Sequence, residues 1–307
     1  MKRVLVTGGR GFIGRHCLPR LAAAGYEIHA VTNHAVAESR LGLEWHRADL
    51  FDAPGVRALI RKVSPSHLLH LAWVTEPGVY WTSPENLRWV AASLELLHAF
   101  REAGGVRAVA AGTCAEYDWS DGICTEATTP LVPATPYGAA KHALQVELGV
   151  LSAQLGLSSA WGRIFFLYGP HEHRERLVPS VIRALLSGEP ARCTHGNQLR
   201  DFLHVADVAD AFVSLFASTV TGAVNIGSGE PVAIREVIGR IGTKLQAPEL
   251  LRFGALPTRE GEPPLLVANV ERLRSDLGWK PKFDLDRGLD HAIAWWKSEA
   301  ASRVGQP

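Results

Sequence analysis

Residues 4–14 of the chain read VLVTGGRGFIG, a short apolar run followed by a glycine-rich turn, and a helical pattern of apolar residues then continues to Gly25. Glycine is needed where the backbone turns with positive φ and where it must come close to a pyrophosphate. The N-terminus of the following helix offers free N–H groups to that anion. Strand, turn and helix in this order predict a dinucleotide-binding site formed by Gly8, Arg10, Gly11, Phe12, Ile13 and Gly14.

The end of the second predicted strand indicates which dinucleotide binds. Residues 28–31 are mostly apolar and lead into Thr32 and Asn33, where a carboxylate is expected if the cofactor has a free ribose 2′-hydroxyl. Arg10 and Arg40 either attract a 2′-phosphate or are ordinary surface charges. The missing carboxylate favours NADP over NAD, with Asn33 and Arg40 among the cofactor contacts.

Further apolar segments at residues 43–46, 66–72, 106–111 and 158–166 predict more strands of a parallel sheet that is covered on both faces. Ligands bind at the carboxyl ends of such strands. Asp49 either binds the adenine or caps the next turn. Leu50, Leu71 and Ala72 are further cofactor candidates. The loop of residues 73–84 contains Thr75, a candidate substrate contact, and two tryptophans that either line a pocket or close the edge of the core.

A tyrosine and a lysine four residues apart, Tyr137 and Lys141, lie one turn from each other on the same face of a predicted helix. An ammonium close to the phenol favours the phenolate and is expected to lower its pKa. The pair therefore predicts a proton-transfer centre for a carbonyl/alcohol couple. Thr113, at the end of a predicted strand, is either a cap or a third member that polarises the substrate oxygen.

The length, composition, net charge and cysteine content of the chain exclude several classes of protein. The chain has 307 residues, of which 47% are hydrophobic and 21% charged, as in a globular protein of roughly two domains. A formal net charge of +1 gives no reason to expect nucleic acid or an acidic membrane surface as a partner. Four scattered cysteines without metal-type spacing indicate reduced thiols and a cytoplasmic protein. No apolar run is long enough to span a bilayer.

The pattern changes after residue 170. Residues 1–170 predict a dinucleotide-binding domain, to which segments at about residues 200–230 return, and residues 171–299 predict a substrate-binding domain. Two loops in the second part carry Arg200 and Arg259. Guanidinium groups hold phosphate oxygens in bidentate fashion, but exposed arginines without a ligand are equally common. The spacing alone leaves both alternatives open.

The chain resembles the extended short-chain dehydrogenase/reductases, in particular their branch of nucleotide-sugar-modifying enzymes, the NAD-dependent epimerase/dehydratase family. The resemblance covers nearly the whole chain. The matching stretches are Thr7–Gly14, Asp49-Leu50, His70-Leu71-Ala72, Thr113 with Tyr137 and Lys141, Arg163–Pro170, Arg200–Val208, Asn225-Ile226-Gly227, Arg259–Glu262 and Leu277–Pro281.

This resemblance implies an α/β fold: a Rossmann-like, doubly wound, seven-stranded and mostly parallel sheet with a smaller C-terminal α/β substrate domain. It implies that Thr113, Tyr137 and Lys141 form the catalytic triad, with Tyr137 and Lys141 also among the cofactor contacts and Lys141 at the nicotinamide ribose. It places Arg200 and Arg259 near the nucleotide and pyrophosphate of a nucleotide-diphosphate sugar. Members of the family are commonly homodimers, which here would pair residues 87–103 and the helix that carries Tyr137.

Departures from the family pattern narrow the reaction. Sugar 4,6-dehydratases carry an acid pair two and three residues before the tyrosine that matches Tyr117, but those positions are Ala115 and Cys114 here. Elimination of water needs an acid at the leaving hydroxyl, so dehydration is not expected. The enzyme that makes GDP-fucose uses a cysteine and a histidine. His171 matches the histidine, and it either contacts substrate or caps the next segment. Cys114, a further candidate substrate contact, is one residue away from the cysteine position.

Two chemistries remain for the same three groups. The first is an NADPH-dependent 4-ketoreductase of a deoxysugar pathway, which the missing ribose carboxylate favours. The second is a nucleotide-sugar 4-epimerase with tightly held NAD. A non-catalytic, dinucleotide-sensing protein on the same fold is a third possibility of another class, and a reductase of a non-nucleotide carbonyl is a fourth.

Overall fold

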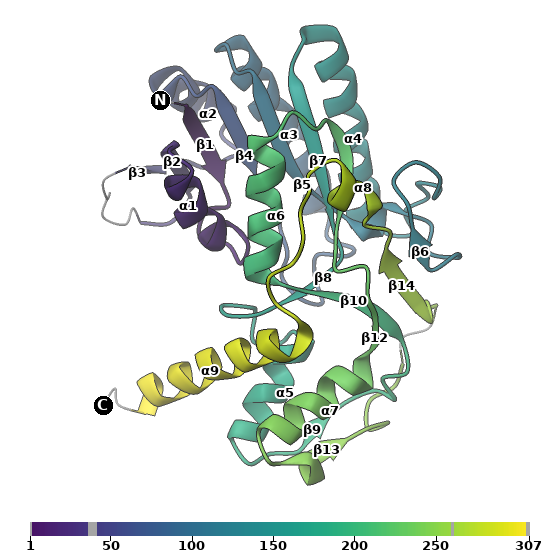
Figure 1. The fold of residues 1–307 in the computed structure, drawn as a ribbon. Helices are drawn as coiled ribbons and strands as arrows, with labels where there is room; N and C mark the ends of the chain where they lie inside the picture. Colours follow the sequence, from purple (N-terminus) through teal and green to yellow (C-terminus); the bar gives the residue numbers. More distant parts are fainter. Residues whose placement is uncertain (1, 36–41, 259–260, 305–307) are drawn as a thin grey trace.

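The computed structural model describes residues 2–35, 42–258 and 261–304. Its centre is a seven-stranded sheet in the order β11-β7-β5-β4-β1-β2-β3, with every neighbouring pair parallel (Figure 1). The strands are β1 (Arg3–Thr7), β2 (Glu27–Thr32), β3 (Leu43–Arg47), β4 (His67–His70), β5 (Arg107–Thr113), β7 (Ser158–Ile164) and β11 (Gly222–Ile226). From β1 the chain first adds β2 and β3 on one side and then β4, β5, β7 and β11 on the other. The order of strands therefore reverses between β1 and β4, beside the glycine turn, which is where such sheets bind ligands. The predicted doubly wound parallel sheet is confirmed.

Two layers of helices cover this sheet, as Figure 1 shows. One face carries α1 (Gly14–Ala23) and α6 (Val205–Ala217), and the other carries α2 (Ala53–Val63), α3 (Glu85–Glu102) and α4 (Pro136–Leu155). Successive side chains of a strand point to opposite faces. Val4 and Val6 of β1 therefore pack with the first layer and Leu5 with the second, and all three are almost fully buried. The continuous apolar run at the start of the chain follows from this two-sided burial.

The smaller C-terminal part contains a second sheet in the order β12-β10-β14-β6, with β8 also paired to β10. Its strands are β6 (Ile123–Cys124), β8 (Phe166–Tyr168), β10 (Leu199–His204), β12 (Pro231–Ala233) and β14 (Leu265–Ala268). Helices α5 (Leu177–Leu186), α7 (Ile234–Lys244) and α9 (Leu285–Val304) pack together at one end of the molecule (Figure 1). The remaining elements are β9 (Ala191–Arg192), β13 (Leu251–Arg252), α8 (Glu271–Ser275) and two 3-10 turns, η1 (Cys114–Glu116) and η2 (Pro248–Leu250).

The chain returns to the first sheet after it has entered the second part, because α6 covers the large sheet and β11 forms its edge beside β7. The boundary near residue 170 between two folding domains stays a prediction. Among the described residues, no helix combines the length and the apolarity that crossing a bilayer requires.

Candidate active site

The glycine turn between β1 and α1 leaves no room for side chains. Gly8 has φ +71°, and a Cβ on it would lie 2.8 Å from the amide nitrogen of Ala72 at the end of β4. A Cβ on Gly14 would lie 2.1 Å from the carbonyl oxygen of Gly8, which also accepts a hydrogen bond of 2.9 Å from the amide of Gly11. The bare backbone at the start of α1 therefore fits a pyrophosphate, and the turn fits a dinucleotide.

The predicted adenosine contacts lie around the ends of β2 and β3. The guanidinium of Arg10 lies over the ring of Trp45 in β3, with 5.0 Å between the guanidinium carbon and the ring centroid. Asn33 is exposed just after β2. Asp49 is exposed too, and its carboxylate accepts a hydrogen bond of 2.9 Å from the amide of Phe51, so the capping role is present. Sequence reasoning missed Trp45, because an aromatic residue in a strand is ordinarily a core residue.

The other predicted cofactor residues are distributed as follows. Phe12, Ile13, Leu50, Leu71 and Ala72 are half-buried, and the backbone of Leu71 and Ala72 packs directly against Gly8. Arg40 lies outside the described residues. The structure thus brings the glycine turn and the end of β4 together, and the roles of these residues in binding a cofactor stay predictions.

The catalytic candidates are positioned by the start of α4. Thr135 is the N-cap, and its hydroxyl accepts a hydrogen bond of 3.1 Å from the amide of Gly138. A Cβ on Gly138 would lie 2.2 Å from the carbonyl oxygen of Ala115, so this glycine lets α4 approach η1 closely. The approach brings the Thr113 hydroxyl close enough to the Tyr137 hydroxyl to lower the pKa of the phenol.

Lys141 occupies a buried position one turn further along α4. Its ammonium donates a hydrogen bond of 2.9 Å to the carbonyl oxygen of Ala111 and lies 3.8 Å from the centroid of the Trp73 ring. Burial lowers the pKa of Lys141 to about 7, although the negative charge of Glu116 opposes this shift. The lysine therefore changes its charge near neutral pH.

The expected lowering of the Tyr137 pKa is not what the structure shows. Burial raises the pKa of Tyr137, the nearby Tyr80 raises it further, and the interaction with the Thr113 hydroxyl lowers it. The reason is that Lys141 is itself buried and directs its ammonium towards Ala111 and Trp73. Tyr137 thus keeps its proton at neutral pH in the protein alone and is ready to donate it.

The loop of residues 73–84 forms the wall of this centre. Tyr80 and Trp81 pack edge-to-face on the ring of Tyr137, with centroids 4.8 and 5.7 Å away. The amide of Tyr137 also donates a hydrogen bond of 3.1 Å to the carbonyl oxygen of Trp81. Together with Trp73 against Lys141, these contacts place both tryptophans beside the catalytic candidates, and their role as lining of a pocket stays a prediction.

A buried ion pair between Glu116 and Arg163 lies next to Thr113 and holds the end of β5 in place. Glu116 is fully buried and accepts hydrogen bonds from the amide of Thr113 at 2.8 Å, from Trp161 at 2.9 Å and from Arg163 at 2.7 Å. These donors fix the end of β5 and thereby Thr113. Because its carboxylate is held by three donors, Glu116 is not available as an acid for elimination. Its partners lie far along the chain, so local spacing gave no signal for this network.

The predicted substrate residues are only partly brought together. Arg200 is 2% exposed and pairs with Glu262, with 2.8 Å between the guanidinium nitrogen and the carboxylate oxygen. Gln198 donates a second hydrogen bond of 2.8 Å to the same carboxylate. The alternative of an ordinary exposed arginine is therefore wrong for Arg200. Arg259 lies outside the described residues.

Two other candidates lie where acid–base chemistry is not favoured. Cys114 is buried, and burial raises the pKa of its thiol. His171 is exposed and packs on Trp295, with 4.6 Å between the ring centroids. Among the contacts of the described residues, none joins His171 to Tyr137 or Thr113. Cys114 is thus unsuited as a general acid, and a substrate role for either residue stays a prediction.

Two charged residues near the wall were missed. The guanidinium of Arg176 lies 5.2 Å from the centroid of the Tyr80 ring and donates to the carbonyl oxygen of the exposed Thr75 at 3.4 Å. Glu172 is buried, and this burial raises its pKa to about 8. One of its carboxylate oxygens has no hydrogen-bond partner among the described residues. No local motif marks either residue, since both depend on how α5 and its preceding loop pack.

Comparisons with known proteins agree with this geometry. Residues 4–227 match the model of the NAD dependent epimerase/dehydratase family. The UDP-glucose 4-epimerase of Azospirillum brasilense is 30% identical over 337 aligned residues, which cover 99% of this chain and 94% of that protein. The crystal structure of the Thermus thermophilus UDP-glucose 4-epimerase in complex with NAD is 29% identical, with a TM-score of 0.85 and coverage of 96% and 99%. The structure of MoeE5 in complex with UDP-glucose and NAD is 32% identical, with a TM-score of 0.85 and coverage of 97% and 99%.

Proposed function

This chain belongs to the NAD dependent epimerase/dehydratase family of extended short-chain dehydrogenase/reductases, and from that premise we propose that it is an NAD-dependent 4-epimerase of a uridine-diphosphate sugar. The observation that carries the proposal is the similarity over nearly the full length to proteins described as UDP-glucose 4-epimerases, one of them solved with NAD. The buried Thr113–Tyr137–Lys141 centre supports it. The epimerase takes precedence here over the reductase that the sequence pattern favours.

We assign the following roles in this reaction to residues of the chain. The glycine turn, Asn33 and Asp49 would hold a dinucleotide, which when bound would supply the hydride-transfer chemistry at carbon 4 of the sugar. Tyr137 moves the proton of the C4 oxygen, and Thr113 orients that oxygen through its hydroxyl. The charge of Lys141 offsets negative charge that develops on the tyrosine oxygen. Arg200 binds the diphosphate and for this exchanges its ion pair with Glu262.

A second candidate function is an NADPH-dependent 4-ketoreductase. The observation that favours it is the end of β2, where Thr32 and Asn33 stand in place of a ribose-binding carboxylate. Arg10, stacked on Trp45 of the neighbouring strand, offers a positive charge for a 2′-phosphate. In this reaction Tyr137 donates its proton to the oxygen of the keto-sugar.

One assay separates the two functions. We expect purified protein with UDP-glucose to form the C4 epimer without net consumption of dinucleotide, as followed by nuclear magnetic resonance. A UDP-4-keto-sugar offered with NADH or NADPH tests the reductase, whose signature is one dinucleotide oxidised per sugar with a preference for NADPH. If the protein oxidises NADH or NADPH with the keto-sugar but forms no epimer from UDP-glucose, the reductase proposal replaces the epimerase proposal. No turnover in either assay would contradict both.

We also propose that the protein is a homodimer that pairs α3 and α4. These helices pack against each other and expose apolar side chains: Leu87 is 75% exposed, and Val146 and Val150 are each 44% exposed. Val146 and Val150 are four residues apart, on one face of α4. Burial of such a stripe in an interface is favourable.

Sedimentation is expected to give twice the chain mass of 33.3 kDa. The substitution Val150→Glu places a charge among the exposed apolar side chains of α3 and α4. It should yield monomers, because dimerisation would bury an unpaired carboxylate in the interface. Val132→Glu is the matched control, since Val132 is 61% exposed but lies in the loop before α4. A dimer that survives Val150→Glu as well as Val132→Glu would rule out this interface.

The cellular compartment is a further proposal. All four cysteines are buried free thiols, which suits a reducing compartment such as the cytoplasm.

A further inference from the structure

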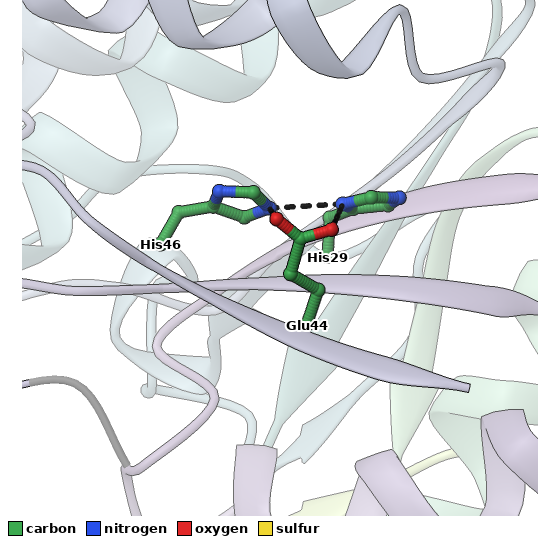
Figure 2. A group of neighbouring side chains, drawn as sticks. All are labelled: His29, Glu44 and His46. Carbon is green, nitrogen blue, oxygen red and sulfur yellow. Dashed lines mark hydrogen bonds and ion pairs between the residues drawn. The ribbon is translucent and has the colours of Figure 1, made fainter. Parts of the chain in front are cut away.

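Three polar side chains meet on one face of the large sheet at its edge, away from the catalytic centre. His29 lies on β2, and Glu44 and His46 lie on β3, the last strand of the sheet (Figure 2). His29 is paired in register with Glu44. Glu44 and His46 are two residues apart and therefore point to the same face. The strand register thus brings together three side chains that the sequence separates by up to seventeen positions.

The ligand atoms of these side chains form a small triangle. Nδ1 of His29 lies 2.9 Å from Nε2 of His46. One Glu44 carboxylate oxygen lies 3.6 Å from the first nitrogen, and the other oxygen lies 3.7 Å from the second nitrogen. When each residue offers one ligand atom, the three atoms all lie within 4.8 Å of one another. A tetrahedral zinc site with bonds of about 2.0–2.1 Å has neighbouring ligand atoms roughly 3.3 Å apart. The nitrogen–nitrogen separation of 2.9 Å and the shorter nitrogen–oxygen separation of 3.6 Å are both close to this value.

We propose that His29, Glu44 and His46 form a binding site for a divalent transition-metal ion, with zinc as the reference ion. Two imidazole nitrogens and one carboxylate oxygen make a three-residue ligand set that leaves a fourth position for water. Imidazole selects zinc, copper and nickel over magnesium or calcium, which prefer oxygen ligands.

The surroundings of His29 hold it in the orientation that a metal ligand needs. Its other nitrogen, Nε2, lies 3.1 Å from a carboxylate oxygen of Glu27, and the Arg3 guanidinium lies 3.0 Å from that same oxygen. A proton on Nε2, donated to Glu27, leaves the lone pair of Nδ1 free to face His46. Histidine ligands of metals ordinarily donate their second nitrogen to a carboxylate in this way, which fixes the tautomer.

Burial and charge are also compatible with an ion. His29 and His46 are buried, whereas Glu44 is half exposed and leaves a path from solvent. Neutral imidazole is the form of histidine that coordinates a metal ion. The positive charge of Lys62 acts on His46 and opposes a cation at this site, as does that of Arg3 behind Glu27.

The site also has a structural link to the cofactor turn. Trp45 lies between Glu44 and His46 in β3, and alternation directs its ring to the opposite face. A Cβ on Gly9 would lie 3.3 Å from that ring, and Arg10 stacks on it. An ion on one face of β3 would therefore fix the strand that carries one wall of the glycine turn.

The test titrates the full-length protein, freed of metal by chelator, with zinc chloride alone in a calorimeter. We expect one ion per chain. Glu44→Gln should weaken the affinity at least about 100-fold, more than the about 10–100-fold loss typical when only the carboxylate behind a ligand is changed. Glu27→Gln changes only the carboxylate behind His29, so its loss of zinc affinity should be the smaller one, about 10–100-fold. Cobalt provides a second readout, since tetrahedral coordination by the site would give visible absorption bands.

Glu102→Gln is the matched control, because Glu102 is also about half exposed and also lies beside a histidine, 3.2 Å from His98. It should bind zinc like the unaltered protein. Neither glutamate is buried, so both variants are expected to fold, which circular dichroism checks. Absence of saturable zinc binding at micromolar concentrations would overturn the proposal, and so would equal affinities of Glu44→Gln and Glu102→Gln. The pair His29–His46 would then be an ordinary hydrogen bond.

Discussion

Tyr137→Phe is expected to lower turnover by more than about 100-fold without unfolding the protein. The phenol is the proposed donor of a proton to the sugar oxygen, because it is protonated at neutral pH and lies beside the hydroxyl of Thr113. Phenylalanine keeps the ring, and with it the edge-to-face packing on Tyr80 and Trp81. The loss should therefore appear in the turnover number and hardly in the Michaelis constant.

Steady-state kinetics with the substrate identified in the epimerase or reductase assay measure this effect. Tyr26→Phe is the control, since Tyr26 is a buried tyrosine that packs on His67 and Phe216, away from the proposed centre. It should keep near-normal turnover. If Tyr137→Phe were as active as Tyr26→Phe, the tyrosine would not be the proton donor, whichever reaction the enzyme catalyses.

The parts of the fold that the sequence predicts are those governed by local rules. The apolar run of β1, the glycine turn and the start of α1 are adjacent in the chain, and each has steric or burial requirements that few residue types satisfy. The same holds for Tyr137 and Lys141, because helical spacing alone places them one turn apart. These elements could be predicted because neighbours in sequence are neighbours in space.

What could not be predicted depends on pairing between distant segments. Arg200 pairs with Glu262, sixty-two residues later, and Glu116 pairs with Arg163, so neither their burial nor their partners are visible in local spacing. The site of His29, Glu44 and His46 likewise exists only through the register of β2 and β3.

The Tyr137 pKa was predicted in the wrong direction for a related reason. The sequence shows which charge is near, but it does not show how much water burial removes. Here burial outweighs the charge, and Trp73 and Ala111 determine where the ammonium of Lys141 points.

Lys141→Met is expected to lower turnover by more than about 100-fold and at the same time to stabilise the fold at low pH. The loss of activity follows because no cation remains to offset charge on Tyr137. The stabilisation follows because a charged lysine is held in a fully buried position, and methionine removes that desolvation cost while keeping a similar shape against Trp73. Losing the hydrogen bond to Ala111 offsets part of the gain, by about 1–3 kcal/mol.

The pH dependence of the stability difference between Lys141→Met and the unaltered protein shows whether removal of the lysine charge, and not a change in side-chain packing, causes the stabilisation. The pKa of Lys141 is about 7 in the folded protein and 10.5 in the reference state, so between these values the unfolded chain binds the proton that the folded protein has lost. The free energy of unfolding of the unaltered protein therefore gains a contribution from Lys141 as pH rises from 7 to 10.5. The advantage of Lys141→Met is greatest below pH 7 and shrinks by on the order of a few kcal/mol across this range.

Urea unfolding of both proteins at several values between pH 6 and pH 10 measures that difference. Groups other than Lys141 titrate in both proteins and largely cancel, and the lost hydrogen bond to Ala111 shifts the difference by a nearly constant amount. A stability difference that stays flat over this range would show that Lys141 is charged throughout in the folded protein. The lysine would then be a permanent cation beside Tyr137, and burial would not be what sets its charge.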